Sequence, residues 1–477
     1  MRFLQAMSIC AAMSSALKAK ADTLATCLPV TTIGRVVLSV SLLVDWFARF
    51  FKRELFYSTV GAMPLQLNAL AVEPWHFSIF YVGSSPFILT ICFLLGLAAY
   101  LGFMFGRNTR LFALLSLLFQ VSLANRNIYP GFCTDIYSAL LIWFIVFPNR
   151  QTVRGWPLYG YLFQLGLIYT ASGLSKITPG SEWLDGTALS EVARYTNITN
   201  SLGQWLGHLP NWMQHALTFS SLSMEILALP LLLLPWTRNW IISVLISFHL
   251  ITLATMNLGE LPVLMIGALL VGFRIKPKFE GAAGPETEAP VNKEKPRTDW
   301  KKWFHSAAPA YVLFTLALVA IISQDVYNRV FWPTLLKWKV EAKPMPVPVP
   351  VQYFTGLVRI RQTWSMFASP LPKTLVWPVI ACTTKGGRQF NFINGEPLNW
   401  QTPDNLAYYY DHRLYKYYNA LYGFYAEGKT NLVNACGEFL VRDWNQRYPE
   451  DTLQHIGIWF GFAPTTNATN ASWVKIY

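Results

Sequence analysis

Residues 87–106, FILTICFLLGLAAYLGFMFG, contain no charged side chain. About 20 apolar residues in a row form a helix long enough to cross the hydrocarbon core of a bilayer. Further apolar runs lie on both sides of it, between residues 33 and 324. The sequence therefore predicts a polytopic membrane protein.

The composition supports this interpretation. Hydrophobic residues make up 53% of the chain and charged residues only 13%, whereas soluble domains carry about 25% charged residues. The formal net charge of +13 could suggest a nucleic-acid partner, but the basic residues lie in loops between the apolar runs, as in cytoplasmic loops of membrane proteins. We therefore expect a lipid bilayer as the partner and no nucleic acid.

About nine apolar segments are expected to cross the membrane. The predicted fold class is an all-α polytopic membrane helix bundle with a small C-terminal α+β extramembrane domain. The segments are residues 33–50, 87–106, 110–124, 133–148, 158–175, 213–235, 238–258, 259–273 and 308–324. The predicted regions are a leader (1–29), the main transmembrane domain (30–275), a basic linker (276–305), a last transmembrane helix (306–324) and the C-terminal domain (325–477).

The distribution of Lys and Arg predicts the orientation. The linker is rich in both, and the loops on its side of the membrane carry more of them than the opposite loops. Because basic loops stay cytoplasmic, the leader and linker should lie inside and the C-terminal domain outside. The leader could instead be a signal peptide. In a bacterial source the expected location is the plasma membrane.

With this orientation, polar residues gather at the outer ends of the helices. Asp45 and Arg49 are one turn apart and can pair. The other members are Asn125, Arg126, Asn127, Asp135, Lys176, Asn257 and Glu260. Ionisable groups near hydrocarbon are costly and often functional, although each could also extend to the membrane interface.

Two ionisable residues lie deeper, near the middle of neighbouring segments. Glu225 and His249 are expected at similar depth on two antiparallel helices joined by a short turn. We therefore expect them within hydrogen-bond or one-water reach of each other. Such a pair would be either a proton relay or a structural clamp.

The tail predicts a small α+β module. Residues 377–383 and 389–393 suggest a hairpin, residues 405–425 and 430–448 two helices, and residues 452–462 a strand. It contains no phosphate-binding loop or metal-ligand spacing, and no metal is predicted. Cys382 and Cys436 could pair in an oxidising compartment or remain free.

Several motifs resemble the horizontally transferred transmembrane (HTTM) domain family, which is related to the vitamin K-dependent gamma-glutamyl carboxylases. The resemblance covers about residues 30–275. The motifs are Asn125-Arg126-Asn127 followed by Asp135, Tyr169 to Lys176 (YTASGLSK), Trp183-Leu184-Asp185-Gly186, Asp45-Trp46 and Phe248-His249. The tail resembles that of many bacterial members at residues 364–368 and 442–445.

The resemblance implies a catalytic base and a cofactor. In the carboxylases a lysine deprotonates vitamin K hydroquinone, whose oxygenation yields a base strong enough to activate a glutamate side chain for carboxylation. That lysine corresponds to Lys176, while Ser175 replaces the lysine before it, and a functional His of the family is missing at the start of the segment containing Asp135. A reduced, vitamin K-like quinone is thus the implied cofactor. The implied binding residues are Asn125, Arg126, Asp135, Trp183 and Asp185.

The sequence is compatible with two functions. One is a carboxylase-like or other quinone-dependent membrane enzyme, with Lys176 as base and Glu225 and His249 as a relay. The other is a non-enzymatic membrane module for the maturation or export of a partner polypeptide. A transporter is less favoured, because the sequence has no internal repeat and no paired broken helices.

Overall fold

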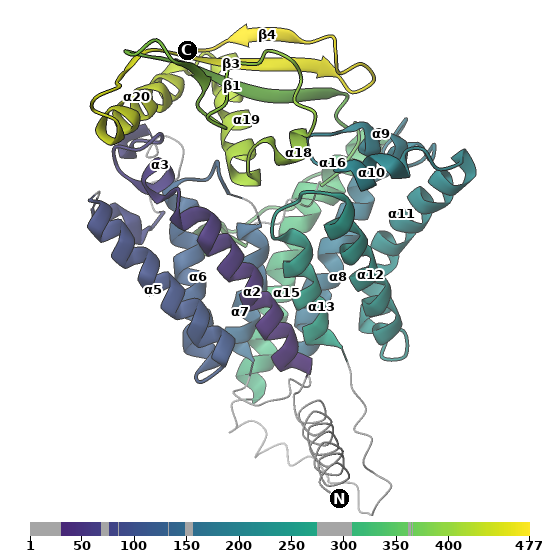
Figure 1. Ribbon diagram of the computed structural model, residues 1–477. Helices are drawn as coiled ribbons and strands as arrows, with labels where there is room; N and C mark the ends of the chain where they lie inside the picture. The colour runs from purple at the N-terminus through teal and green to yellow at the C-terminus, as the bar shows by residue number, and fades with distance from the viewer. Residues whose placement is uncertain are drawn as a thin grey trace, which may run out of the picture.

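The computed structural model describes residues 30–477, apart from residues 68–75, 84, 132, 148–155, 274–307, 361–363 and 365. The predicted leader and the predicted linker lie outside the described residues. Figure 1 shows the long helices side by side, with the sheet and helices α18, α19 and α20 gathered at one end of them. This arrangement places one compact extramembrane domain against the ends of a helical bundle.

Each predicted apolar segment contains a helix. These helices are α2 (Val30–Phe50), α5 (Pro86–Phe105), α6 (Thr109–Arg126), α7 (Thr134–Val146), α8 (Trp156–Lys176), α11 (Asn211–Leu233), α12 (Arg238–Thr255), α13 (Leu261–Gly272) and α15 (Ala308–Val326). Shorter helices lie between or after them: α3 (Arg53–Tyr57), α9 (Ala188–Arg194), α10 (Ser201–Leu206), α16 (Trp332–Lys337) and α17 (Val349–Leu357). A 3₁₀ turn, η1 (Ile79–Tyr81), and a π-helical turn, η2 (Tyr327–Phe331), complete this part.

The boundaries of α5 follow from its sequence. The Ser85 side chain accepts a hydrogen bond from the backbone N–H of Ile88 (3.2 Å), and Pro86 occupies the first helical position, where it needs no donor. Gly106 ends the helix at φ +73°, a left-handed conformation that glycine adopts without strain. The apolar run at residues 87–106 is therefore one helix with a cap at each end.

Within the described residues, four helices are long and apolar enough to cross a membrane. They are Pro86–Phe105, Asn211–Leu233, Arg238–Thr255 and Val312–Lys337, the last of which joins α15 to α16 through η2. The prediction of nine spans is confirmed only as far as these four. Helix α7 has 13 residues and α13 has 12, so at about 1.5 Å per residue neither alone covers the roughly 30 Å hydrocarbon core.

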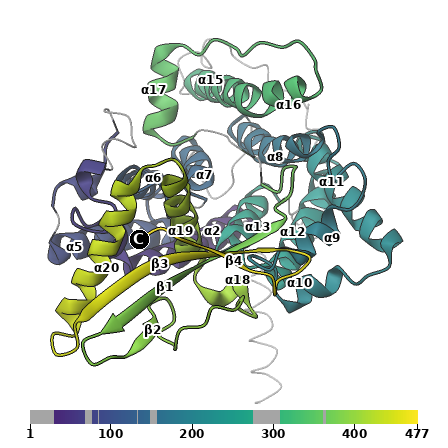
Figure 2. The same ribbon diagram turned by 90° about the horizontal axis from the view of Figure 1, so that it is seen from above.

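Glycines allow the closest helix crossings in the bundle. A Cβ on Gly34 of α2 would lie 2.5 Å from the backbone N of Val271, and one on Gly267 of α13 would lie 2.5 Å from the backbone N of Leu38. Helices α2 and α13 therefore touch backbone to backbone, as small residues permit between helices in lipid. Figure 2 shows α15, α16 and α17 along one side of the molecule, beside α8.

The C-terminal domain is a four-stranded antiparallel sheet with three helices. Its strands are β1 (Thr374–Thr384), β2 (Gln389–Asn391), β3 (Leu453–Pro464) and β4 (Ser472–Lys475), in the order β2-β1-β3-β4. Its helices are α18 (Leu406–Tyr409), α19 (His412–Ala426) and α20 (Thr430–Arg447).

The predicted hairpin, helices and strand of the tail are all present, while β4 was not predicted. The region expected to form one helix over residues 405–425 is divided into α18 and α19. The break occurs because Asp411 caps α19, its side chain accepting from the backbone N–H groups of Arg413 and Leu414. Cys382 and Cys436 are both buried and free.

Candidate functional site

A buried ion pair joins Lys176, the last residue of α8, to Glu225 in the middle of α11. The Lys176 Nζ lies 2.6 Å from Glu225 Oε1 and also contacts Oε2. The two residues are only 1% and 5% exposed. The Lys176 side chain is therefore buried among protein groups and not exposed on the surface. Its Nζ also donates to the Ser172 hydroxyl at 3.3 Å.

The close crossing of α8 and α11 places this pair. A Cβ on Gly173 would lie 3.0 Å from the backbone N of Ile226, and one on Gly166 would lie 2.7 Å from the Cα of Leu229. Only a residue without a side chain permits this approach. Lys176 is one turn beyond Gly173, and Glu225 immediately precedes Ile226, so the crossing brings the two side chains together.

A proline in α11 strengthens the same crossing. Pro230 has no N–H, so the carbonyl of Ile226 loses its helical donor. The hydroxyl of Thr170, on α8, donates to that carbonyl at 3.0 Å and accepts from the backbone N–H of Leu229 at 3.2 Å. Thr170 of α8 thus hydrogen-bonds to the backbone of α11 where Pro230 interrupts it. This contact fixes the relative position of the two helices.

The loop after α8 covers the ion pair. The Trp183 ring centroid lies 4.5 Å from Lys176 Nζ, within cation–π range. The Trp183 Nε1 donates to the carbonyl of Phe367 (2.8 Å), and the Glu182 carboxylate accepts from the Ser369 hydroxyl (2.5 Å). A segment of the C-terminal half of the chain therefore holds the cover in place.

Apolar side chains surround this cover. The cluster is made of Trp183, Ala188, Val192, Leu222 and Leu371, with Ile177, Ile226, Met256 and Phe367 packed against it. The carbonyl of Ile177, next to Lys176, also accepts from the Trp338 Nε1 at 2.7 Å. The ion pair thus lies against an apolar, tryptophan-rich wall.

His249 has a different partner from the one that the sequence predicted. Its Nε2 lies 2.6 Å from the hydroxyl of Tyr169 on α8, whereas Glu225 binds Lys176. The hydrogen bonds of Glu225 and His249 thus run to Lys176 and Tyr169, and the predicted hydrogen-bond or one-water reach between Glu225 and His249 stays a prediction. Equal depth fixes position along a helix axis but not the direction in which a side chain points. The Nδ1 of His249 is buried and has no hydrogen-bond partner among the described residues.

A second group of buried charges, the outer charge cluster, consists of Asp45, Arg49, Glu260 and Arg413. Arg49 Nε donates to Asp45 Oδ1 at 2.7 Å, which confirms the predicted pairing. Arg413, the second residue of α19, contacts Asp45 and donates to Glu260 Oε1 at 2.7 Å. All four residues are at most 5% exposed.

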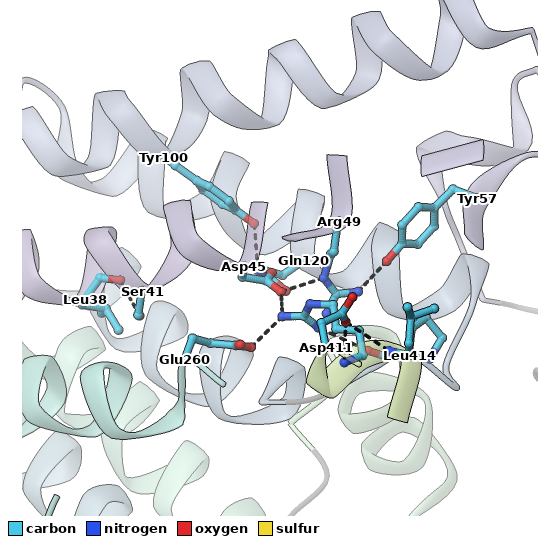
Figure 3. Close-up of polar contacts among 12 residues, drawn as sticks. Leu38, Ser41, Asp45, Arg49, Tyr57, Tyr100, Gln120, Glu260, Asp411 and Leu414 are labelled. Atoms are coloured by element: carbon cyan, nitrogen blue, oxygen red, sulfur yellow. Dashed lines mark hydrogen bonds and ion pairs between the residues drawn. The ribbon is translucent and has the colours of Figure 1, made fainter. Parts of the chain in front are cut away.

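Neutral groups complete the outer charge cluster. Gln120 Nε2 donates to Asp45 Oδ2 at 2.8 Å and to the Tyr100 hydroxyl at 2.7 Å, and Arg49 donates to the Tyr57 hydroxyl at 2.5 Å. Figure 3 shows Asp45, Arg49, Gln120 and Glu260 pointing toward one another. The cluster joins α2, α5, α6 and the start of α13 to the C-terminal domain.

The remaining predicted binding residues hold local structure. Asn125 donates to the carbonyl of Phe77 at 2.9 Å, and Arg126 donates to the carbonyls of Tyr57 and Met63 at 3.1 and 2.9 Å. These contacts fix the loop that follows α3.

Asp135 and Asp185 lie apart from both charged groups. Asp135 faces Arg359 at 3.3 Å. Asp185 is exposed, and the hydroxyl of Thr187 donates to it at 2.6 Å, which lowers the pKa of that carboxyl. Of the predicted binding residues, only Trp183 touches Lys176.

Sequence analysis missed Tyr169 and Arg413. Tyr169 is seven residues before Lys176 and so shares its helix face, a signal that could have been used. Arg413 lies in a polar tail segment, where nothing marks it as a partner of membrane residues. No group of three or more His, Cys, Asp or Glu side chains in the described part of the chain could hold a metal ion.

Comparison with known proteins identifies one part of the chain. Residues 111–276 match the family model described as the HTTM domain. No curated protein and no solved structure matches the chain. The matched region runs from the first turn of α6 to just beyond α13, and it contains Lys176, Glu225 and His249. Residues 111–276 of the chain thus form an HTTM domain.

Proposed function

We propose that the protein is a membrane enzyme in which Lys176 acts as a base toward an apolar, weakly acidic hydroxyl compound of the reduced-quinone class. The observation that carries this proposal is the buried Lys176–Glu225 pair, covered by Trp183. Buried ion pairs give little net stability, because the desolvation of two charges offsets their attraction. A charged pair kept inside a membrane domain is therefore a candidate functional site.

The arrangement offers a specific route for a proton. A lysine acts as a base only in its uncharged form. Glu225 is the group placed to take the proton of Lys176, at 2.6 Å. The Ser172 hydroxyl, at 3.3 Å, can hold the amine in the same position after that transfer.

The residues around the pair fit a reduced quinone. The Trp183 ring, Leu222 and Ile226 form an apolar wall beside Lys176, and such a wall suits a flat hydrophobic ring with few polar atoms. When bound, a reduced quinone would supply an acidic hydroxyl, and its oxidation by molecular oxygen would supply the driving force for a difficult proton abstraction. Lys176 would hold its hydroxyl, and Trp183 would exclude water. A peptide carrying glutamate is the corresponding second substrate. In a bacterial source, the corresponding location is the plasma membrane.

Mass spectrometry of the purified protein tests the proposal. The protein is isolated in mild detergent, and its bound lipids and polypeptides are identified. Quinone at close to one equivalent, lost in Lys176→Ala but kept in Lys385→Ala, which removes an exposed lysine of the C-terminal domain, is the expected result. A stoichiometric polypeptide partner without quinone would instead favour the non-enzymatic module for maturation or export.

A further inference from the structure

A pocket lies where the membrane bundle meets the C-terminal domain, away from Lys176. It has a volume of about 340 Å³, within the range of small-molecule sites. One wall is the segment Phe51–Leu55, at the end of α2 and the start of α3, and the other comes from α19, α20 and the residues after β2. Figure 1 shows α3 directly beneath α20.

The pocket carries charges of both signs. Arg53 and Glu54 line it from α3, and Asp443 and Arg447 line it from α20. Arg447 donates to Asp443 at 2.9 Å with its own side chain 64% exposed, and Arg53 and Glu54 are 3.9 Å apart. In each pair one partner is exposed, while Asp443 and Arg53 are only 15% and 22% exposed. Solvent reaches the exposed partner and screens the attraction, so such pairs contribute about 0–1 kcal/mol. A ligand with one positive and one negative group can therefore replace them at little cost.

Lys52, the remaining cation of the pocket, is already engaged. Its Nζ lies 2.5 Å from Asp411 Oδ2, outside the pocket lining. The lining thus has no large excess of either charge once this pair is counted. An anionic headgroup would meet as many carboxylates as cations, whereas a zwitterionic headgroup would be matched on both sides.

The pocket lies beside the first two turns of α5. Arg53 Nε donates to the hydroxyl of Thr90 at 3.2 Å, and Thr90 lies in the second turn of α5, a helix long and apolar enough to cross a membrane. Phe51, on the pocket wall, is 76% exposed. A large exposed aromatic side chain at this level is typical of the interfacial region of a bilayer.

An exposed apolar stripe leads from the pocket down α2. Val40, Val44 and Phe47 are 39%, 47% and 52% exposed, and Phe51 follows at the next turn. Their spacing of three or four residues places them on one face of the helix. This face offers an acyl chain a continuous apolar path that ends at the charged pocket.

We propose that this pocket binds the headgroup of a zwitterionic phospholipid, with one acyl chain along the stripe on α2. The phosphate lies between Arg53 and Arg447, and the ammonium group lies between Glu54 and Asp443. The aromatic wall from Phe51 covers the glycerol region. The lipid thereby bridges α3 of the bundle and α20 of the C-terminal domain.

Lipid retention in nanodiscs tests this site. The full chain is reconstituted in equal amounts of phosphatidylethanolamine and phosphatidylglycerol, released into detergent, and its bound lipid is measured by native mass spectrometry. We expect retained phosphatidylethanolamine in the wild type and about tenfold weaker retention in Arg447→Glu, the effect of losing a charge-assisted hydrogen bond. Lys429→Glu is the matched control, because Lys429 is exposed and paired with Glu427 outside the pocket.

A second variant separates binding from folding. Phe51→Gln changes an exposed side chain, so the melting temperature should stay near that of the wild type while lipid retention falls. Equal retention by wild type, Arg447→Glu and Phe51→Gln would overturn the proposal, as would a preference for phosphatidylglycerol. Free phosphoethanolamine that competes as well as the intact lipid would also overturn it, because the stripe on α2 would then contribute nothing.

Discussion

The guanidinium of Arg413, on α19 of the C-terminal domain, contacts Asp45 of α2 and donates to Glu260 Oε1 before α13 at 2.7 Å. Arg49 and Arg413 together balance the charges of the two carboxylates. The C-terminal domain is thus fixed to the membrane bundle by a buried cation that the bundle itself does not supply.

Removal of this cation should loosen the whole molecule. Arg413→Leu leaves two carboxylates and one arginine in a site that is at most 5% exposed, and breaking a buried ion pair costs about 3–5 kcal/mol. Thermal unfolding in detergent should therefore begin at a clearly lower temperature. Arg388→Leu, in the exposed turn between β1 and β2, is the control. Equal melting temperatures for both variants would show that the cluster does not hold the domains together.

Lys176 and Glu225 should be strongly coupled. Lys176→Met or Glu225→Met alone strands a buried charge, at a cost of about 3–5 kcal/mol. The double variant removes both charges and should cost less than the sum by about 1–3 kcal/mol. A double-mutant cycle of unfolding free energies measures this difference. Simple additivity would contradict the 2.6 Å contact between them.

His249 should be coupled to Tyr169. Tyr169→Phe removes the hydroxyl that lies 2.6 Å from His249 Nε2, and a stranded polar partner costs about 1–3 kcal/mol. Adding Tyr169→Phe to His249→Leu should therefore cost less than Tyr169→Phe alone. A cycle in which Glu225→Gln takes the place of Tyr169→Phe should show weaker coupling. Stronger coupling of His249 to Glu225 than to Tyr169 would instead support the Glu225–His249 contact predicted from the sequence.

The stability of the C-terminal domain should fall on acidification. Burial lowers the pKa of His412, at the start of α19, to about 3, and nearby Lys416 and Arg413 act in the same direction, against a hydrogen bond with the backbone of Asn257. The unfolded chain binds a proton near pH 6.5, so between about pH 6.5 and 3 it holds more protons than the folded chain, and stability decreases by about 1 kcal/mol per pH unit. His412→Gln should flatten this dependence in pH-dependent melting. If the stability of His412→Gln falls with pH as steeply as that of the wild type, groups other than His412 cause the pH dependence.

Cysteine labelling tests the membrane orientation that the distribution of Lys and Arg predicts. This distribution predicts Arg297 on the inside and Thr465 on the outside. A membrane-impermeant thiol reagent applied to intact cells should label Thr465→Cys and leave Arg297→Cys unmodified, with labelling after lysis as the control for reactivity. The opposite pattern would invert the topology.

The features that could be predicted from the sequence are those that depend on the spacing of residue types along the chain. The apolar runs predicted the helices, because a helix that packs in lipid needs apolar side chains. The Asp45–Arg49 pair was predicted because the two residues are one helical turn apart. Lys176 and Glu225 were each singled out because ionisable residues are rare in such segments.

Three-dimensional partnerships could not be predicted in the same way. Which side chain meets Glu225 depends on how α8 and α11 cross at Gly166 and Gly173, and a hydropathy pattern carries no information on that rotation. Arg413 is 368 residues from its partner Asp45. Only the docking of the C-terminal domain brings them together.

The activity of Lys176→Arg shows whether Lys176 acts as a base. Wild type, Lys176→Ala and Lys176→Arg are given reduced vitamin K or menaquinol with oxygen and bicarbonate, and quinol oxidation is followed. Arg keeps the positive charge that faces Glu225 but stays protonated at any working pH. If Lys176 is the base, the wild type turns over and neither variant does, although Lys176→Arg is folded. Full turnover in Lys176→Arg, or no turnover in the wild type, would contradict this role of Lys176.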